Sequence, residues 1–331
     1  MAPDRRWLYI TAYVALWSAQ AILIKNSQSR QTENVDDHQY PYEIMAMTLF
    51  IELFKITLSL TIFLFTSEES SSDIRTKSII LINKFPDGIY FIIPAAVYVM
   101  YNGLAFINLK LMEPGTYRIL INTRIVFSGL LSQWFFKKWL RPRQWYGLVL
   151  LMLACVVEQS ESFSPDDGLI AIAMMSVQGV CSSLGGVYFQ WLLQHKDSSD
   201  MGIWLKNIYL YFWSIVFNLL AIIAFRPEIL SNLLVGFDMH ALAILVVAGL
   251  GGVCTSLVLR HLDVLIKEYA NFAEMVVVAV IQRVMFGIPL RLTLVLAIIM
   301  VSYSLYLYQV PSKARQLSTE ARLLDVKSVK S

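Results

Sequence analysis

The chain has 331 residues, of which 57% are hydrophobic and only 15% are charged, and its formal net charge is +3. A soluble domain carries about a quarter charged residues, so this composition indicates a membrane protein and excludes a disordered chain. The basic residues are spread along the chain, which argues against a nucleic-acid partner. Cys155, Cys181 and Cys254 all lie in apolar runs, and an odd, buried set predicts neither a disulfide framework nor a zinc site.

Ten apolar runs are long enough to cross a membrane, because a spanning helix needs about 20 mostly apolar residues. In chain order they cover residues 7–25, 44–66, 88–109, 115–136, 144–160, 168–193, 204–225, 240–260, 269–286 and 291–310. No small-residue cleavage pattern follows the first run, so we expect a retained span rather than a signal peptide. The sequence therefore predicts an all-α, polytopic membrane protein with ten transmembrane helices.

Basic residues divide unequally between the two sides of this ten-span arrangement. The termini and the even-numbered loops contain 18 of them, and the other loops contain five. The positive-inside rule then places both termini in the cytosol. The loop that contains Glu158, Glu161, Asp166 and Asp167 has four acids and no base, and we expect it to face the opposite compartment.

Ten spans divide into two sets of five, and an odd number of spans in each half would invert one half relative to the other. The stretches Leu104–Leu109 and Leu257–Leu262 are similar, and each ends a span, but chance similarity explains this equally well. We expect a single transmembrane transporter domain, with halves of approximately 1–162 and 163–310. Residues 311–331 would form a cytosolic tail.

A few charges lie inside the predicted spans, where each costs about 2.5–3.5 kcal/mol on insertion scales. They are Glu52, Lys55, Arg118, Arg124, Glu274 and Arg283. Glu52 and Lys55 are three residues apart, so they either pair or serve transport. Arg118 and Arg283 lie near span ends and can snorkel to the headgroups. Arg124 lies about ten residues into its span, which favours a functional role.

Tyr117 and Arg124 are seven residues apart, which would place them on one helix face. A guanidinium and an aromatic ring suit an anionic, ring-bearing ligand, since the first binds phosphate and the second stacks on a base. Further polar groups recur in the later spans: Ser182, Ser183, Asn207, Tyr209, Tyr211, Thr255, Ser256 and Lys267. Neither a phosphate loop, nor a metal-ligand cluster, nor an acid–base pair is evident, so we expect a carrier without a cofactor and not an enzyme.

Six stretches of the chain match motifs of a known transporter family. They are Glu52–Ile56, Val97–Asn102, Thr116–Ile125, Cys181–Phe189, Trp204–Tyr211, and Gly251–Ser256 with the following Arg260, Asp263 and Lys267. Through them the chain resembles the nucleotide-sugar transporters of the Golgi, in the branch of the CMP-sialic acid, UDP-galactose and UDP-N-acetylglucosamine carriers. These belong to the drug/metabolite transporter superfamily.

The resemblance implies a ten-helix fold with cytosolic termini in the Golgi membrane, and exchange of a cytosolic CMP- or UDP-linked sugar for a lumenal nucleoside monophosphate. The substrate-binding residues that it implies are Tyr117, Arg124, Asn102, Ser182, Ser183, Gly186, Asn207, Tyr211, Thr255, Ser256 and Lys267. Glu52, Lys55 and Arg118 would lie at a gate or at the sugar end. Expected partners are the two nucleotides and the bilayer, while a homodimer or an association with glycosyltransferases stays open.

Some residues depart from the family pattern. Arg124 replaces a lysine, and Arg118 replaces a glutamine, so that it either favours a more acidic donor or pairs with Glu274. Asn271, Glu274 and Arg283 occupy a span that is mostly small and apolar in the family. Two alternatives remain: a carrier of another small solute, and a non-transporting regulator or scaffold of this fold. The sequence also leaves open which sugar is carried, and the Golgi against the endoplasmic reticulum.

Overall fold

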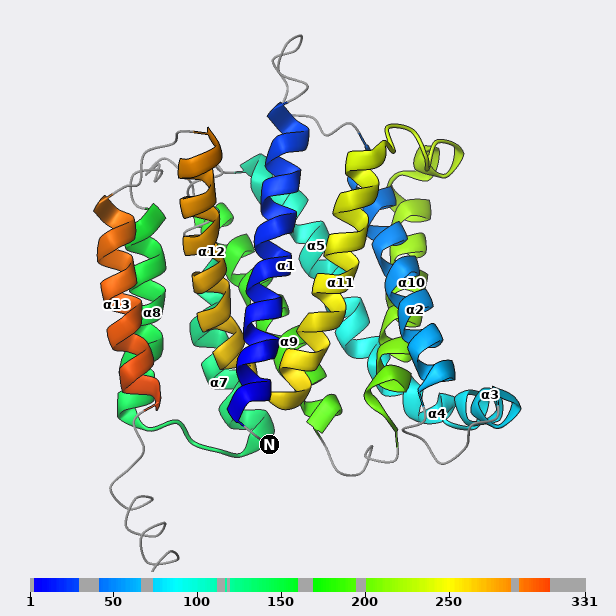
Figure 1. The fold of residues 1–331 in the computed structure, drawn as a ribbon, viewed down its shortest axis with the longest axis horizontal. Helices are drawn as coiled ribbons and strands as arrows, with labels where there is room; N and C mark the ends of the chain where they lie inside the picture. The colour runs from blue at the N-terminus through cyan, green and yellow to red at the C-terminus, as the bar shows by residue number, and fades with distance from the viewer. Residues whose placement is uncertain are drawn as a thin grey trace, which may run out of the picture.

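The computed structural model describes residues 3–29, 42–66, 74–111, 117, 120–159, 169–194, 201–286 and 292–309, and these are helical with no strand. Figure 1 shows the long helices running roughly parallel as one bundle, with α3 and α4 at one end. In chain order the helices are α1 (Pro3–Ser29), α2 (Ile44–Phe65), α3 (Ile74–Asn83), α4 (Phe85–Gly88), η1 (Ile89–Phe91), α5 (Ile92–Leu111), α7 (Arg124–Phe136), α8 (Pro142–Gln159), α9 (Leu169–Gln194), α10 (Ile203–Phe225), η4 (Pro227–Ser231), α11 (Met239–His261), α12 (Val264–Phe286) and α13 (Leu292–Gln309).

Within the described ranges, five segments are long and apolar enough to cross a bilayer. They are Arg6–Ser27, Ile44–Phe65, Phe85–Ala105, Ile203–Phe225 and Met239–His261. Large apolar side chains also face outward, among them Phe65, Trp134 and Val284, each more than two-thirds exposed. Such a surface suits lipid and not water. The prediction of an all-helical, multi-pass membrane protein is thus confirmed, and a helix overlaps each of the ten predicted runs.

The fourth predicted span is not one regular helix. Asn122 and Thr123 form a turn, and α7 begins only at Arg124. The Val126 amide donates to the Thr123 carbonyl at 3.0 Å, a tight three-residue step. Arg124 is therefore the first residue of a helix rather than a residue ten positions into one. The turn removes the premise of an unbroken helix from the argument that Tyr117 and Arg124 share one face, although the two side chains lie within electrostatic range of each other.

The ninth predicted span begins earlier than expected. We predicted a start at residue 269, whereas α12 begins at Val264. Lys267 and Glu268 are therefore helical residues and not loop residues. This shift of boundary matters for the site, because it adds a third acid to the two predicted inside the spans.

Helices that are far apart in the sequence make the main contacts of the bundle. α8 packs against α13, α2 against α10, α1 against both α11 and α12, and α9 against both α5 and α7. α5 also contacts α10, and α2 also contacts α11. The contact between α2 and α11 is close: a Cβ added to Gly249 would clash with the Phe54 ring, which would have to move to accommodate it.

Two lysines that we assigned to cytosolic loops are buried at helix ends instead. Lys77 donates from Nζ to the carbonyls of Phe63, Leu64 and Thr66 at 2.6–3.1 Å, at the C-terminal end of α2. Lys206 donates to the Leu192 carbonyl at 2.9 Å, near the end of α9. A cation there satisfies carbonyls that a helix end leaves without partners. Without these two, the same side still holds 16 bases against five.

Candidate functional site

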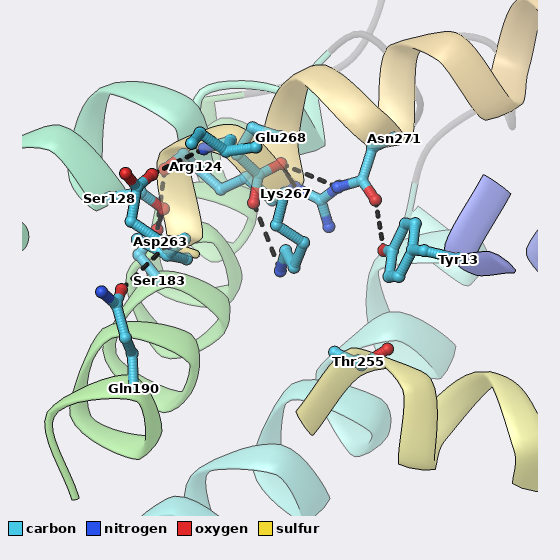
Figure 2. A network of polar contacts seen from close by, with 12 residues as sticks. Tyr13, Arg124, Ser128, Ser183, Gln190, Thr255, Asp263, Lys267, Glu268 and Asn271 are labelled. Carbon is cyan, nitrogen blue, oxygen red and sulfur yellow. Dashed lines mark hydrogen bonds and ion pairs between the residues drawn. The ribbon is translucent and has the colours of Figure 1, made fainter. Parts of the chain in front are cut away.

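A buried carboxylate joins two cations inside the bundle (Figure 2). The Glu268 side chain is only 3% exposed, and its Oε2 lies 3.3 Å from Nε of Arg124 on α7. Its Oε1 lies 3.3 Å from Nζ of the adjacent Lys267 on α12. Asn271 donates to Oε2 at 2.9 Å, and the Tyr13 hydroxyl of α1 donates to Oδ1 of Asn271 at 2.5 Å. We call these five residues the Glu268 cluster.

Two serines hold the first turn of α7 in place. The Ser183 hydroxyl on α9 donates to the Arg124 carbonyl at 2.7 Å and accepts from the Ser128 hydroxyl at 3.1 Å. Both serines are buried. Ser183 was predicted to bind substrate, and its hydroxyl proton is already used here. What it visibly does is position the backbone of Arg124.

The other cation of the cluster lies against a glycine of α9. A Cβ added to Gly186 would lie 3.2 Å from Cγ2 of Val264 and 4.0 Å from Nζ of Lys267. A Cβ here would crowd Val264, whereas it would be in ordinary van der Waals contact with the ammonium group. Gly186 therefore lies directly beside Lys267.

A second polar cluster lies where α2, α10 and α11 meet. Lys55 pairs with Glu52 at 2.5 Å, and its Nζ lies 4.5 Å from the centre of the Tyr211 ring, which is a cation–π distance. A Cβ on Gly252 would lie 2.7 Å from Cδ of Lys55, so this glycine makes space for the lysine. Pairing of Glu52 with Lys55, one of the two possibilities left open by the sequence, is what the structure shows.

Several buried polar atoms of this second cluster have no hydrogen-bond partner within the described ranges. They are Oδ1 of Asn207, the hydroxyl of Tyr211 and Oε2 of Glu52. Asn207 does donate to the Ser256 hydroxyl at 2.8 Å, and Ser256 donates to the Val253 carbonyl. Buried polar groups normally find a partner. These three atoms are therefore the ones that a polar ligand would satisfy.

The two clusters border a common region. Tyr98 of α5 lies within electrostatic range of both Glu52 and Glu268, and its ring is 3.2 Å from a Cβ added to Gly185. Thr255, which we predicted for the site, accepts from the Trp17 indole at 3.3 Å. Trp17 lies on α1, as Tyr13 does. Residues of α1, α2, α5, α7, α9, α10, α11 and α12 thus border one central region.

Tyr117 belongs to a third polar group. Gln178 of α9 donates to the Tyr117 hydroxyl at 2.8 Å and accepts from Asn108 of α5 at 2.6 Å. Asn102 is exposed and Ser182 is half-buried, and no contact in the described part of the chain joins either to the two clusters. Arg118 lies outside the described residues.

The sequence interpretation missed Glu268, Tyr13 and Gln178. Glu268 directly follows Lys267, which we did select, but the predicted start of the ninth span left the acid in a loop. The acid that contacts Arg124 is Glu268. Tyr13 and Gln178 carry no signal of their own, because single polar residues in apolar runs are common. Arg283 is exposed in the last turn of α12.

A multi-helix membrane bundle with buried cations and partnerless polar atoms is consistent with a carrier for a polar solute. Comparison with known proteins agrees. Residues 6–309 match the family described as nucleotide-sugar transporter. The chain therefore belongs to the nucleotide-sugar transporter family, whose members are transporters and not enzymes.

Individual relatives cover almost the whole chain. The UDP-galactose transporter senju of Drosophila melanogaster is 29% identical over 89% of this chain and 84% of its own. The CMP-sialic acid transporter 1 of Oryza sativa subsp. japonica is 27% identical over 92% and 95%. A solved structure described only as the crystal structure of a protein shares the fold, with a TM-score of 0.68 at 15% identity over 93% of this chain and 98% of that one.

Proposed function

We propose that the protein is an antiporter that moves a CMP- or UDP-linked sugar from the cytosol into the Golgi lumen in exchange for the nucleoside monophosphate. The observation that carries this proposal is the pair of inward cations, Arg124 and Lys267, in a chain that belongs to the nucleotide-sugar transporter family. Buried cations in a membrane protein mark a substrate pathway. The relatives named for CMP-sialic acid and UDP-galactose support the choice of nucleotides.

The geometry suggests how one nucleotide sugar would occupy the region. Arg124 and Lys267 would bind the phosphate, since a guanidinium and an ammonium are its preferred partners. The partnerless atoms of Asn207 and Tyr211, with Ser256, would contact the nucleoside. Glu52 and Lys55 would lie at the sugar end or gate, with Arg118 as predicted from the resemblance. The remaining proposed lining residues are Tyr117, Asn102, Ser182, Ser183, Gly186 and Thr255.

We also propose ten spans arranged as an inverted five-plus-five repeat, and the helix contacts support it. Let α1, α2, α5, α7 and α8 correspond to α9, α10, α11, α12 and α13. The contact of α1 with α11 then maps onto that of α9 with α5, and α7 with α9 onto α12 with α1. The contact of α5 with α10 maps onto α11 with α2, while the pairs α2–α10 and α8–α13 map onto themselves. An unrelated pair of halves has no reason to match in this way.

Uptake by proteoliposomes tests the proposed exchange. A panel of labelled CMP-, UDP-, GDP- and ADP-linked sugars is offered to vesicles that are empty or preloaded with CMP, UMP, GMP or AMP. We expect uptake of one nucleotide class, CMP or UDP, and faster uptake when the matching monophosphate is inside. Control vesicles contain no protein. The absence of protein-dependent uptake for every donor would contradict the proposal and favour a non-transporting regulator of this fold.

The orientation follows from the charge distribution and has its own test. We propose that both termini are cytosolic and that the acidic loop of residues 158–167 is lumenal. In sealed organelles, protease should remove epitope tags at either terminus, whereas a tag inserted at residues 162–166 should be cleaved only after detergent is added. A terminal tag that is protected in sealed organelles, or a loop tag that is cleaved in them, is incompatible with ten spans in this orientation.

A further inference from the structure

Glu268 lies inside the proposed phosphate site and has the wrong charge for an anionic substrate. Its two carboxylate oxygens face different cations, Oε2 towards Arg124 and Oε1 towards Lys267, each at 3.3 Å. The same two cations are the proposed ligands of the substrate phosphate. A phosphate that approaches the same donor atoms, Nε of Arg124 and Nζ of Lys267, therefore competes with the carboxylate for them.

The contact between Glu268 and Arg124 is electrostatic and poorly aligned. The guanidinium Nε is buried and makes no geometrically acceptable hydrogen bond, although it lies 3.3 Å from the carboxylate. A bidentate arginine–carboxylate pair would be shorter, about 2.7–2.9 Å, and would use two parallel hydrogen bonds. Glu268 thus compensates the charge of Arg124, but the pair lacks the two short hydrogen bonds of a strong arginine–carboxylate contact.

A second set of contacts holds the carboxylate independently of the cations. Asn271, one turn further along α12, donates to Oε2 at 2.9 Å, and the Tyr13 hydroxyl fixes that amide (Figure 2). Withdrawal of Glu268 from the cations would therefore not leave the acid without a hydrogen-bond donor. Glu268 therefore has a hydrogen-bond donor whether or not it contacts the cations.

We infer that Glu268 is a resident counterion of the empty carrier, which the substrate phosphate displaces from Arg124 and Lys267. The inference rests on the proposed function and deepens it. Two unpaired cations inside the membrane would oppose the reorientation of the empty carrier from one side of the membrane to the other, because each charge is costly there. Glu268 lowers the charge of the three groups from +2 to +1, so the empty carrier can return. Transport by this chain is then only partly dependent on exchange.

The variant Glu268→Gln separates this role from a purely structural one. Glutamine keeps the shape and an oxygen for Asn271, but it no longer competes for the cations. We expect the affinity for UMP or CMP to rise about tenfold or more, the equivalent of one charge-assisted contact. We also expect the empty carrier to return more slowly. Glu228→Gln, which removes a 59% exposed acid that pairs with Arg226, is the control and should resemble the wild type in both respects.

The experiment uses the full-length protein in proteoliposomes loaded with labelled UMP or CMP. Efflux is measured into nucleotide-free buffer and into buffer that contains the same unlabelled monophosphate, and binding is measured on the purified protein. For the wild type we expect clear efflux into nucleotide-free buffer. For Glu268→Gln we expect that efflux to fall at least several-fold relative to exchange, while binding becomes tighter.

Three outcomes would overturn the inference. The first is a folded Glu268→Gln variant that binds the monophosphate no more tightly than the wild type. The second is wild-type efflux that occurs only with external nucleotide. If the Glu268→Gln variant does not fold, this measurement on the wild type is sufficient to test the inference. In both cases the proposed function survives, because exchange still occurs. The third is a wild-type protein that neither binds nor exchanges either monophosphate, which removes the proposed function as well.

Discussion

Replacement of Arg124 by alanine should abolish nucleotide-sugar transport and leave the protein folded. Loss of one charge-assisted phosphate contact corresponds to about 1.5–3 kcal/mol, roughly ten- to a hundredfold in affinity. The fold should survive because Glu268 keeps two other partners, Lys267 and Asn271. The α7 backbone also stays anchored, since Ser183 bonds to the carbonyl of residue 124 and not to its side chain.

Thermal stability in detergent, measured with and without CMP or UMP, checks this expectation alongside uptake. Arg124→Ala should have a melting temperature close to that of the wild type, but CMP or UMP should no longer raise it. Arg124→Lys should retain part of the uptake and part of the stabilisation by nucleotide, because the charge remains. Arg283→Ala, which removes an exposed arginine of α12, is the control. A structural role for Arg124 would show as an unfolded Arg124→Ala protein that is restored by the added change Glu268→Gln.

Disruption of the Glu52–Lys55 pair should lower the free energy of unfolding more than the other substitutions. Lys55→Met leaves the Glu52 carboxylate in the bundle without its cation, and one of its oxygens already lacks a partner. Removal of one partner of a buried ion pair costs about 3–5 kcal/mol. Because both side chains are 12% exposed, we expect the lower end of that range.

The double variant Glu52→Gln with Lys55→Met distinguishes packing from transport. With both charges removed, the melting temperature should return most of the way to that of the wild type. Uptake should stay low, because the cation over the Tyr211 ring is absent. Lys84→Met serves as a control, since Lys84 pairs across 3.9 Å with a half-exposed acid outside the bundle. Full uptake by the double variant would show that the pair stabilises the structure and has no part in transport.

Hydrophobic runs were sufficient to locate the long helices, because a spanning segment must be apolar over most of its length, whereas α3 and η4 lie outside every predicted run. They could not locate the break before α7. Asn122 and Thr123 lie in a run that is otherwise compatible with a helix, and neither glycine nor proline marks the turn. The start of α12 was missed for a related reason. Asp263, Lys267 and Glu268 read as a polar loop, although the last two belong to the helix.

The candidate site was predictable in its residue types but not in its pairings. Lys267 and Arg124 were selected separately, whereas the acid between them follows only from the packing of α7 against α12. The contact between Asn207 and Ser256 likewise joins residues 49 positions apart. The burial of Lys206 had no signal in the sequence, because a lysine beside a span reads as a loop charge under the positive-inside rule.

The central claim is that Arg124 and Lys267 bind the phosphate of a CMP- or UDP-linked sugar that is exchanged for its own monophosphate. The proteoliposome panel tests it most directly when matched and mismatched preloading are compared for a single donor. We predict that the matching monophosphate accelerates uptake several-fold, that mismatched purine monophosphates do not, and that Arg124→Ala removes the difference. Equal uptake of one donor into vesicles preloaded with any of the four monophosphates, unchanged in Arg124→Ala, would contradict the account.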